Sequence, residues 1–210
     1  MIDQAQLTAA LVERHGAENQ RKFARATVGI AGLGGLGSHI AVSLARLGVG
    51  KLVLADFDKV DLTNLNRQHY FLRHLGCPKA EALQEQLMEI NPYLTYDAHT
   101  VRVTAENACT LFGGCQVVCE AFDQPDQKAM LTEAVLTGLP QTVLVAGSGM
   151  AGSASANAIR TARRFGRFYI CGDGQADIAD GLGLMAPRVA VCAAHQATMV
   201  MRLLLGQPDP

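Results

Sequence analysis

The sequence predicts an α/β protein with a Rossmann-like, doubly wound sheet that is mainly parallel and has an antiparallel edge. Three observations lead to this fold class: predicted strands alternate with predicted helices, a glycine-rich turn follows the first strand, and no linker divides the 210 residues. We therefore expect a single domain. Residues 1–25 would form a helical lead-in, residues 27–146 the βα units, and residues 147–210 an edge hairpin and a final helix.

Hydrophobic periodicity and turn residues define the expected elements. Apolar residues at helical spacing predict helices that stop near Gly48, Asn91 and Gly138, and short apolar or β-branched runs predict the strands between them. The small-residue run 147–156 breaks the alternation, and a hairpin is expected after it. In chain order we predict helix 1–25 with a break near Gly16, strand 27–31, helix 38–47, strand 51–55, helix 79–91, strand 93–103, helix 105–112, strand 116–121, helix 127–136, strand 141–146, hairpin strands 157–161 and 167–171, and helix 189–205.

Composition is typical of a globular chain. With 18 basic and 19 acidic residues there is no overall cationic field, so DNA or an anionic membrane surface is not an expected partner. The N-terminus lacks the pattern of a secretory signal, and no apolar stretch approaches the roughly 20 residues that cross a bilayer, so we expect a cytoplasmic protein. Six cysteines without a C-x-x-C pair argue against a four-thiolate zinc site and a disulfide scaffold.

The glycine-rich turn predicts a nucleotide site within residues 27–146. Gly32, Gly34, Gly35 and Gly37 follow a strand and begin a helix, where main-chain N–H groups can approach a phosphate or ribose. Asp56 ends the second strand, 19 positions after the last of these glycines, and can accept hydrogen bonds from ribose hydroxyls. These two features fit NAD and ATP equally well.

Polar residues beyond Asp56 favour ATP. The chain has no Tyr-x-x-x-Lys pair and no second domain to hold an oxidisable substrate, which leaves a dehydrogenase without a catalytic centre. Arg67, in the turn after Asp56, and Lys79, at a helix start, can instead clamp a triphosphate, and Asn64 can orient the same phosphates.

A further carboxylate, Asp123, follows the buried strand 116–121. Ligands of open α/β sheets bind at this edge, and Mg²⁺ needs only one or two protein carboxylates beside phosphate oxygens. Asp123 is therefore the expected magnesium ligand. Asp126 is expected to cap the next helix.

Taken together, the motifs resemble those of the E1-like ThiF/MoeB-type adenylyltransferases, from about residue 10 to 206, and the short ThiF type in particular. The resemblance implies that the glycine turn and Asp56 hold the nucleotide, that Asn64, Arg67 and Lys79 hold phosphates, and that Asp123 holds Mg²⁺. The motifs that carry it are Gly32-x-Gly-Gly-x-Gly-Ser38, Ala45-Arg-Leu-Gly-Val-Gly-Lys51, Asp56-Phe-Asp58, Asn64-Leu-Asn-Arg-Gln68, Lys79, Asp123, Gly183-Leu-Met-Ala-Pro187 and Gln196-Ala197.

The resemblance also implies a reaction. The C-terminal glycine carboxylate of a ubiquitin-like sulfur carrier, of the ThiS type used in thiamine biosynthesis, attacks the α-phosphate of ATP and forms an acyl adenylate and pyrophosphate. The carboxylate is already ionised at neutral pH, so positioning and charge neutralisation suffice and no general base is required. A molybdopterin-type carrier, a tRNA-borne carboxylate and a non-catalytic subunit of an activating enzyme remain as alternatives, and an NAD oxidoreductase comes last.

The remaining expectations concern partners and cysteines. The family implies a homodimer and a possible sulfur-donor protein, and an apolar stretch at 199–205 is consistent with a dimer. Unlike the long members, this chain has no paired C-x-x-C motifs and only a short segment before Gly183, so zinc is not expected. Cys171 is then the nearest sulfur-transfer candidate, with simple packing as the other interpretation. An arginine acting across a dimer, Arg14 or Arg21, is left unassigned.

Overall fold

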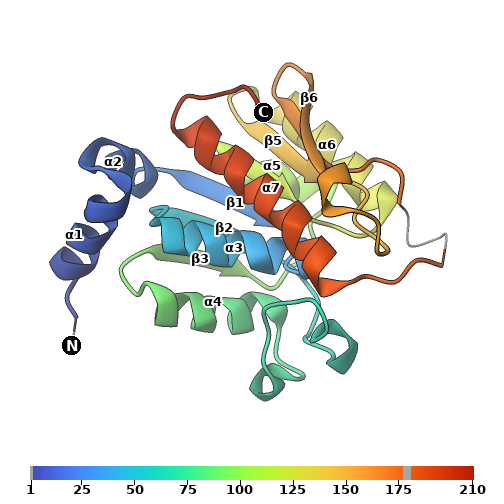
Figure 1. Ribbon diagram of the computed structural model, residues 1–210, viewed down its shortest axis with the longest axis horizontal. Helices are drawn as coiled ribbons and strands as arrows, with labels where there is room; N and C mark the ends of the chain where they lie inside the picture. Colours follow the sequence, from blue (N-terminus) through green and yellow to red (C-terminus); the bar gives the residue numbers. More distant parts are fainter. Residues whose placement is uncertain (1, 177–180) are drawn as a thin grey trace.

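The computed structural model describes residues 2–176 and 181–210 and contains a seven-stranded sheet with helices on both faces (Figure 1). The strand order is β3-β2-β1-β4-β5-β7-β6, and every neighbouring pair is parallel except β6 and β7 at the edge. The predicted fold class is thereby confirmed. The strands are β1 Thr27–Ala31, β2 Lys51–Ala55, β3 Thr95–His99, β4 Val117–Glu120, β5 Val143–Gly147, β6 Arg160–Phe165 and β7 Phe168–Gly172.

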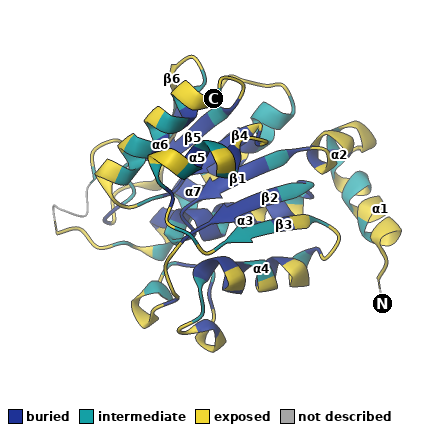
Figure 2. Ribbon diagram, turned by 180° about the vertical axis from the view of Figure 1, so that it is seen from behind, coloured by how far each residue is buried: buried dark blue, intermediate teal, exposed yellow. Residues whose placement is uncertain are grey.

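Two layers of helices cover the sheet. Helices α3, α4 and α7 lie on one face of the sheet, and α5 and α6 lie on the other (Figures 1 and 2). The side chains of the two layers form two separate hydrophobic clusters. Successive side chains of a strand point to opposite faces, so each strand contributes to both clusters. In β2, Leu52 and Leu54 belong to the first cluster and Val53 to the second. The helices are α1 Gln4–His15, α2 Ala17–Ala24, α3 Gly35–Leu47, α4 Lys79–Ile90, α5 Ala105–Phe112, α6 Pro125–Gly138 and α7 Ala186–Leu204, with short 3₁₀ turns η1 Leu62–Asn64, η2 Leu72–His74 and η3 Ala156–Ala158.

Several element boundaries differ from those predicted. The first hairpin strand begins at Arg160 rather than at residue 157, because Ser155 caps the 3₁₀ turn η3 that occupies the preceding residues. The capping role expected for Asp126 is wrong: α6 begins at Pro125, a residue well suited to the first helical position, with Gln124 before it. Asp126 lies inside the first turn and accepts a hydrogen bond from the Gln127 N–H.

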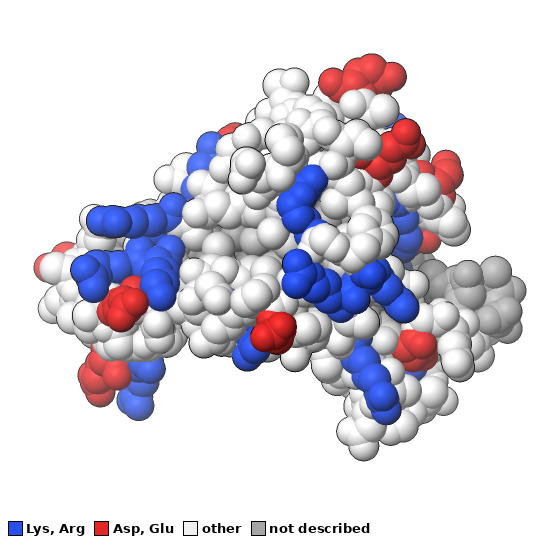
Figure 3. Space-filling model, turned by 90° about the horizontal axis from the view of Figure 1, so that it is seen from above, with Lys and Arg blue, Asp and Glu red and all other residues white. Residues whose placement is uncertain are grey.

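The N-terminal helices extend from one end of the body, and α1 buries no residue (Figure 1). Seen from above, Lys and Arg side chains gather in separate groups, one of them at the end formed by α1 and α2 (Figure 3). Charge is thus distributed in patches. No helix in the described part of the chain combines the length and apolar character needed to cross a membrane.

Candidate nucleotide-binding site

A cavity of about 490 Å³ opens at the carboxyl ends of the parallel strands. It lies where the strand order reverses, between β1 and β4, which is the usual ligand position in open α/β sheets. The structure brings eight of the predicted site residues to this cavity, although they come from five separate places in the chain. These lining residues are Gly32, Gly34, Gly35, Asp56, Asn64, Arg67, Lys79 and Asp123.

Two glycines of the turn, Gly32 and Gly37, are required for different structural reasons. Gly32 adopts φ +87°, and a β-carbon there would lie 2.8 Å from the Ala121 carbonyl oxygen. A β-carbon at Gly37 would lie 1.8 Å from the Gly32 carbonyl oxygen, so this residue allows α3 to start directly against the turn. Gly37 does not line the cavity, unlike Gly34 and Gly35. Gly37 therefore has a packing role, since it lets the turn and the start of α3 lie in contact.

Asp56 braces the glycine turn from the end of β2. One carboxylate oxygen accepts the Leu33 N–H at 2.7 Å and the other accepts the Asp58 N–H at 2.8 Å. Burial raises the pKa of Asp56, an effect that the nearby Lys79 ammonium and the two N–H donors oppose. Each oxygen keeps acceptor capacity, because a carboxylate can take about four hydrogen bonds. A ribose hydroxyl can therefore bind without displacing either N–H.

Both candidate phosphate-binding cations already have protein partners. Nη1 of Arg67 donates to the Thr63 carbonyl at 3.2 Å and to the Asn66 side chain at 2.8 Å. Nζ of Lys79 donates to Asp58 at 2.9 Å. The turn that carries Arg67 is itself fixed by Asn64, whose side-chain oxygen accepts the Asp61 N–H at 3.1 Å. A bound phosphate would share these cations with their present partners.

Asp123 lies in the exposed turn between β4 and α6 and lines the cavity. In residues 2–176 and 181–210, no group of three or more His, Cys, Asp or Glu side chains is placed to hold a metal ion. A single carboxylate beside triphosphate oxygens still satisfies the preference of Mg²⁺, which retains several waters. The side chains present thus fit a magnesium ion that arrives with a nucleotide, whereas they do not form a protein-only metal site.

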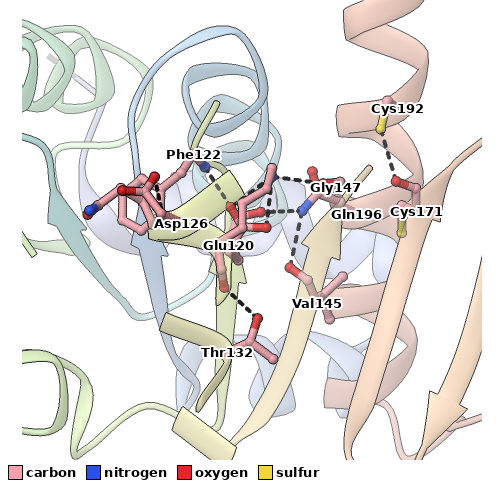
Figure 4. A network of polar contacts seen from close by, with 11 residues as sticks. Glu120, Phe122, Asp126, Thr132, Val145, Gly147, Cys171, Cys192 and Gln196 are labelled. Carbon is pink, nitrogen blue, oxygen red and sulfur yellow. Dashed lines mark hydrogen bonds and ion pairs between the residues drawn. The ribbon is translucent and has the colours of Figure 1, made fainter. Parts of the chain in front are cut away.

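A buried network under the cavity was not predicted (Figure 4). Glu120, at the end of β4, is 1% exposed, and its oxygens accept from Lys128 Nζ at 3.0 and 2.9 Å. The same ammonium donates to the Gly147 carbonyl at 2.8 Å, so it joins the ends of β4 and β5. The side-chain amide of Gln196 repeats this link by donating to the Glu120 and Val145 carbonyls at 3.0 and 3.1 Å.

Sequence reasoning missed Lys128 and Arg102, both of which line the cavity. The signal for the first was the glutamate at position 120 inside a buried apolar strand, since such a carboxylate requires a cation. Arg102 has no such signal, because its guanidinium lies 3.7 Å from the Phe57 ring centroid through a contact made across 45 residues of chain.

Cys171 lies away from the cavity, in the core. It is 0% exposed on β7, and burial raises the pKa of its thiol to about 11. Thr161 Oγ1 is its side-chain neighbour at 3.4 Å. A buried, protonated thiol is a poor nucleophile, so this position favours the packing interpretation over sulfur transfer.

Comparison with known proteins identifies the family of this chain. Residues 6–210 match the ThiF family. The chain belongs to the ThiF family. Among curated relatives of this ThiF-family chain, the sulfur carrier protein adenylyltransferase of Thermus thermophilus is 36% identical over 60% of the chain and 47% of that protein. The Anopheles gambiae adenylyltransferase and sulfurtransferase MOCS3 is 34% identical over 64% of the chain and 30% of that protein. The chain thus spans less than half the length of these relatives.

Solved structures support the same fold. The Escherichia coli tRNA N6-threonylcarbamoyladenosine dehydratase TcdA, in complex with ATP, superposes with a TM-score of 0.87 at 23% identity, covering 99% of this chain and 98% of that one. The E. coli protein MccB with ATP gives a TM-score of 0.69 at 22% identity, covering 97% of this chain and 65% of that one. At this level of identity the likeness establishes the fold.

Proposed function

We propose that this ThiF-family protein is an ATP-dependent adenylyltransferase that activates the C-terminal glycine carboxylate of a ubiquitin-like sulfur carrier. One observation carries the proposal. One cavity, at the point where the strand order reverses, is lined by the glycine turn, Asp56, Arg67, Lys79 and Asp123. It therefore offers a hydrogen-bond acceptor for the ribose, two cations for the phosphates and a carboxylate for Mg²⁺ in one place. A non-catalytic subunit would have no need to retain all of these groups.

Each group has a role that follows from its charge. The acceptor carboxylate is ionised at neutral pH and attacks the α-phosphate in line, so the protein must bring the two anions together. Arg67 and Lys79 offset the charge that develops on the phosphates and on the departing pyrophosphate. Magnesium supplies further neutralisation when bound, and Asp123 would hold it. The ribose hydroxyls bind Asp56, which leaves the triphosphate directed toward the cations.

The carrier class rests on the relatives. Their names include a sulfur carrier protein adenylyltransferase and a ubiquitin-like modifier-activating enzyme 5, both of which point to a carrier protein as acceptor, and MOCS3 is named an adenylyltransferase and sulfurtransferase. Within that class we propose a ThiS-type carrier in cytoplasmic thiamine biosynthesis. A molybdopterin-type carrier is the next candidate. A tRNA-borne carboxylate is also tested, because the TcdA likeness extends over nearly the full length of both chains.

The deciding experiment is ATP–pyrophosphate exchange with the possible acceptors offered separately. A ThiS-type carrier, a molybdopterin-type carrier and tRNA bearing the carboxylate are compared with a carrier that lacks its C-terminal glycine. We expect exchange that requires Mg²⁺ and the intact ThiS-type terminus. Exchange with only one of the other acceptors would reassign the substrate. No exchange with any of them would overturn the proposal, and tight NAD binding would then favour an oxidoreductase.

We also propose that the protein is a homodimer. The C-terminal turns of α7 keep Met201, Leu203 and Leu204 only half-buried, which leaves apolar surface beside the core helix. Light scattering should give twice the 22.3 kDa chain mass. A monomeric mass with full exchange activity would contradict the dimer.

A further inference from the structure

A buried ion pair joins the start of α7 to a loop on the far side of the cavity. Arg188, in the first turn of α7, pairs with Asp173, and their side chains are only 5% and 10% exposed. Asp173 begins the loop that follows β7, residues 173–176, so the pair ties this loop to the start of α7. Residues 148–155 form the loop that follows β5, the neighbouring parallel strand.

The remaining contacts of Arg188 are also with loop residues. Its guanidinium donates to the carbonyls of Ala151 at 3.1 Å, Ala154 at 2.5 Å and Ser155 at 2.8 Å. In the part of the chain that the structure describes, every side-chain hydrogen bond of Arg188 goes to a residue at least 15 positions away. This arginine therefore holds the loops and contributes no side-chain bond to its own helix.

Asp173 organises the second loop in a similar way. One of its oxygens accepts the Gln175 and Ala176 N–H groups, both at 2.9 Å, while its own N–H donates to the Gly149 carbonyl at 3.0 Å. Gly149 has φ +79°, and a β-carbon at that position would lie 2.1 Å from an Asp173 carboxylate oxygen. The two loops are thus in direct contact through the backbone bond from Asp173 to Gly149, and the Asp173 carboxylate leaves no room for a side chain at position 149.

The joined loops form one wall of the cavity. They lie after β5 and β7, on the opposite side of the switch point from β2, whose end carries Asp56. If Asp56 binds the ribose, this wall faces the reacting end of the ligand, because ligands of open α/β sheets extend across the crevice. The wall residues are Ser148, Gly149, Met150, Ala151, Gly174, Gln175 and Ala176.

Stability alone does not explain a buried pair at this place. Removing two charges from water costs free energy that their attraction often fails to recover, and apolar residues of similar size frequently stabilise a fold equally well. What the pair provides is directional. Four hydrogen bonds from one planar group add to the backbone bonds that Ser148 and Gly149 make with residues 171–174, and together they define a single arrangement of the two loops.

We propose that Arg188 and Asp173 are positioning residues that shape the wall receiving the acceptor carboxylate. The inference rests on the proposed adenylation reaction. It assigns the nucleotide and the acceptor to opposite walls of one cavity, and it makes acceptor recognition sensitive to a residue that touches neither substrate.

The test compares Arg188→Met with Arg202→Met, a control at another arginine of α7, whose side chain donates to the Asp209 carbonyl and lies off the cavity. For Arg188→Met we expect carrier kcat/KM in the exchange assay to fall by about tenfold or more while the ATP dissociation constant stays within about twofold. Arg188→Lys should recover part of the loss, since it keeps the charge but not the planar fork. The control should match the parent.

Hydrogen–deuterium exchange provides a readout that does not depend on activity. Amides in 148–155 and 173–176 should exchange faster in Arg188→Met than in the control, with the glycine turn unchanged. If Arg188→Met fails to fold, Gly149→Ala disturbs the same junction, because its β-carbon collides with Asp173.

Three results would overturn the inference: carrier kcat/KM at the control level, ATP affinity falling in parallel with carrier kcat/KM, or unchanged loop exchange. A parent that supports no exchange with any acceptor would overturn the proposed function and this inference together. An active parent with an unaffected Arg188→Met variant would remove only the inference.

Discussion

The Lys79 ammonium lies 2.9 Å from the Asp58 carboxylate, and the lysine is the buried partner, with a side chain 7% exposed against 48% for the aspartate. The positive charge of Lys79 in the cavity wall is therefore already neutralised by Asp58. A phosphate would have to compete with Asp58 or share the ammonium with it. Lys79 and Asp58 should therefore have opposite effects on nucleotide binding.

Asp58→Asn should tighten ATP binding several-fold, because removing a carboxylate beside the phosphate position leaves the positive charge of Lys79 less compensated. Lys79→Met should weaken it by about tenfold or more, since a charge-assisted contact is lost. Titration calorimetry at constant ionic strength measures both. Equal weakening in the two variants would mean that Asp58 itself contacts the nucleotide.

Arg67→Ala should lower the rate of ATP–pyrophosphate exchange by about a hundredfold or more. This corresponds to an increase on the order of 3 kcal/mol in the activation barrier, by analogy with the loss of one hydrogen-bond donor to a transition state. Circular dichroism establishes whether the variant is folded. A folded variant with near-parent exchange would place Arg67 outside the reacting centre.

Asp123→Asn should separate ATP affinity from turnover. The glycine turn and Asp56 are untouched, so nucleotide binding is partly retained, whereas the magnesium concentration needed for half-maximal exchange should rise. Exchange measured across a magnesium series in parent and variant provides the comparison. Superimposable magnesium profiles would contradict the metal role of Asp123.

Two histidines make stability depend on pH. Nε2 of His39 lies 3.2 Å from the Arg67 carbonyl and must donate to it, so its Nδ1 accepts from His69 Nε2 at 3.0 Å. Burial and the neighbouring His39 and Arg46 lower the pKa of His69 from 6.5 to about 4, so the folded state holds this ring neutral while the unfolded chain protonates it. Stability present above pH 6.5 should therefore be lost as the pH falls toward about 4.

Urea unfolding at a series of pH values tests this, with His69→Gln as the comparison. The parent should lose more unfolding free energy than the variant over this range. The difference between the two proteins isolates His69, because burial also lowers the pKa values of His39 and His74. Parallel pH profiles would mean that protonation of His69 is not linked to folding.

Cys171→Ala should leave ATP–pyrophosphate exchange near the parent rate, because adenylation needs positioned phosphates and an ionised carboxylate but no thiol. We also expect the parent to contain no stoichiometric zinc. Both adenylation and thiocarboxylate formation should be assayed on the same variant. Loss of exchange itself would contradict the separation of adenylation from thiol chemistry, whereas loss of the sulfur step alone would identify Cys171 as a nucleophile.

Local sequence patterns were sufficient to predict the main residues of the candidate site. The glycine turn, Asp56 and Lys79 each belong to a strand end or a helix start that can be identified within a few residues. Parallel strands present their carboxyl ends at one edge of the sheet, so recognising the alternation already places these groups together. For this reason the predicted residues meet at one cavity although they were chosen from separate segments.

The partners of the buried charges depended on tertiary structure. Glu120 was recognisable in a buried strand, but Lys128 is eight positions away and Gln196 is 76 positions away. Arg188 and Asp173 meet because β7 lies beside β5 and the first turn of α7 lies against the loops that follow these strands, an arrangement that no local pattern specifies. Local spacing determines which groups lie at a strand end, because backbone geometry repeats within a few residues. Pairing between distant charges is decided only when the packed layers bring them together and exclude water.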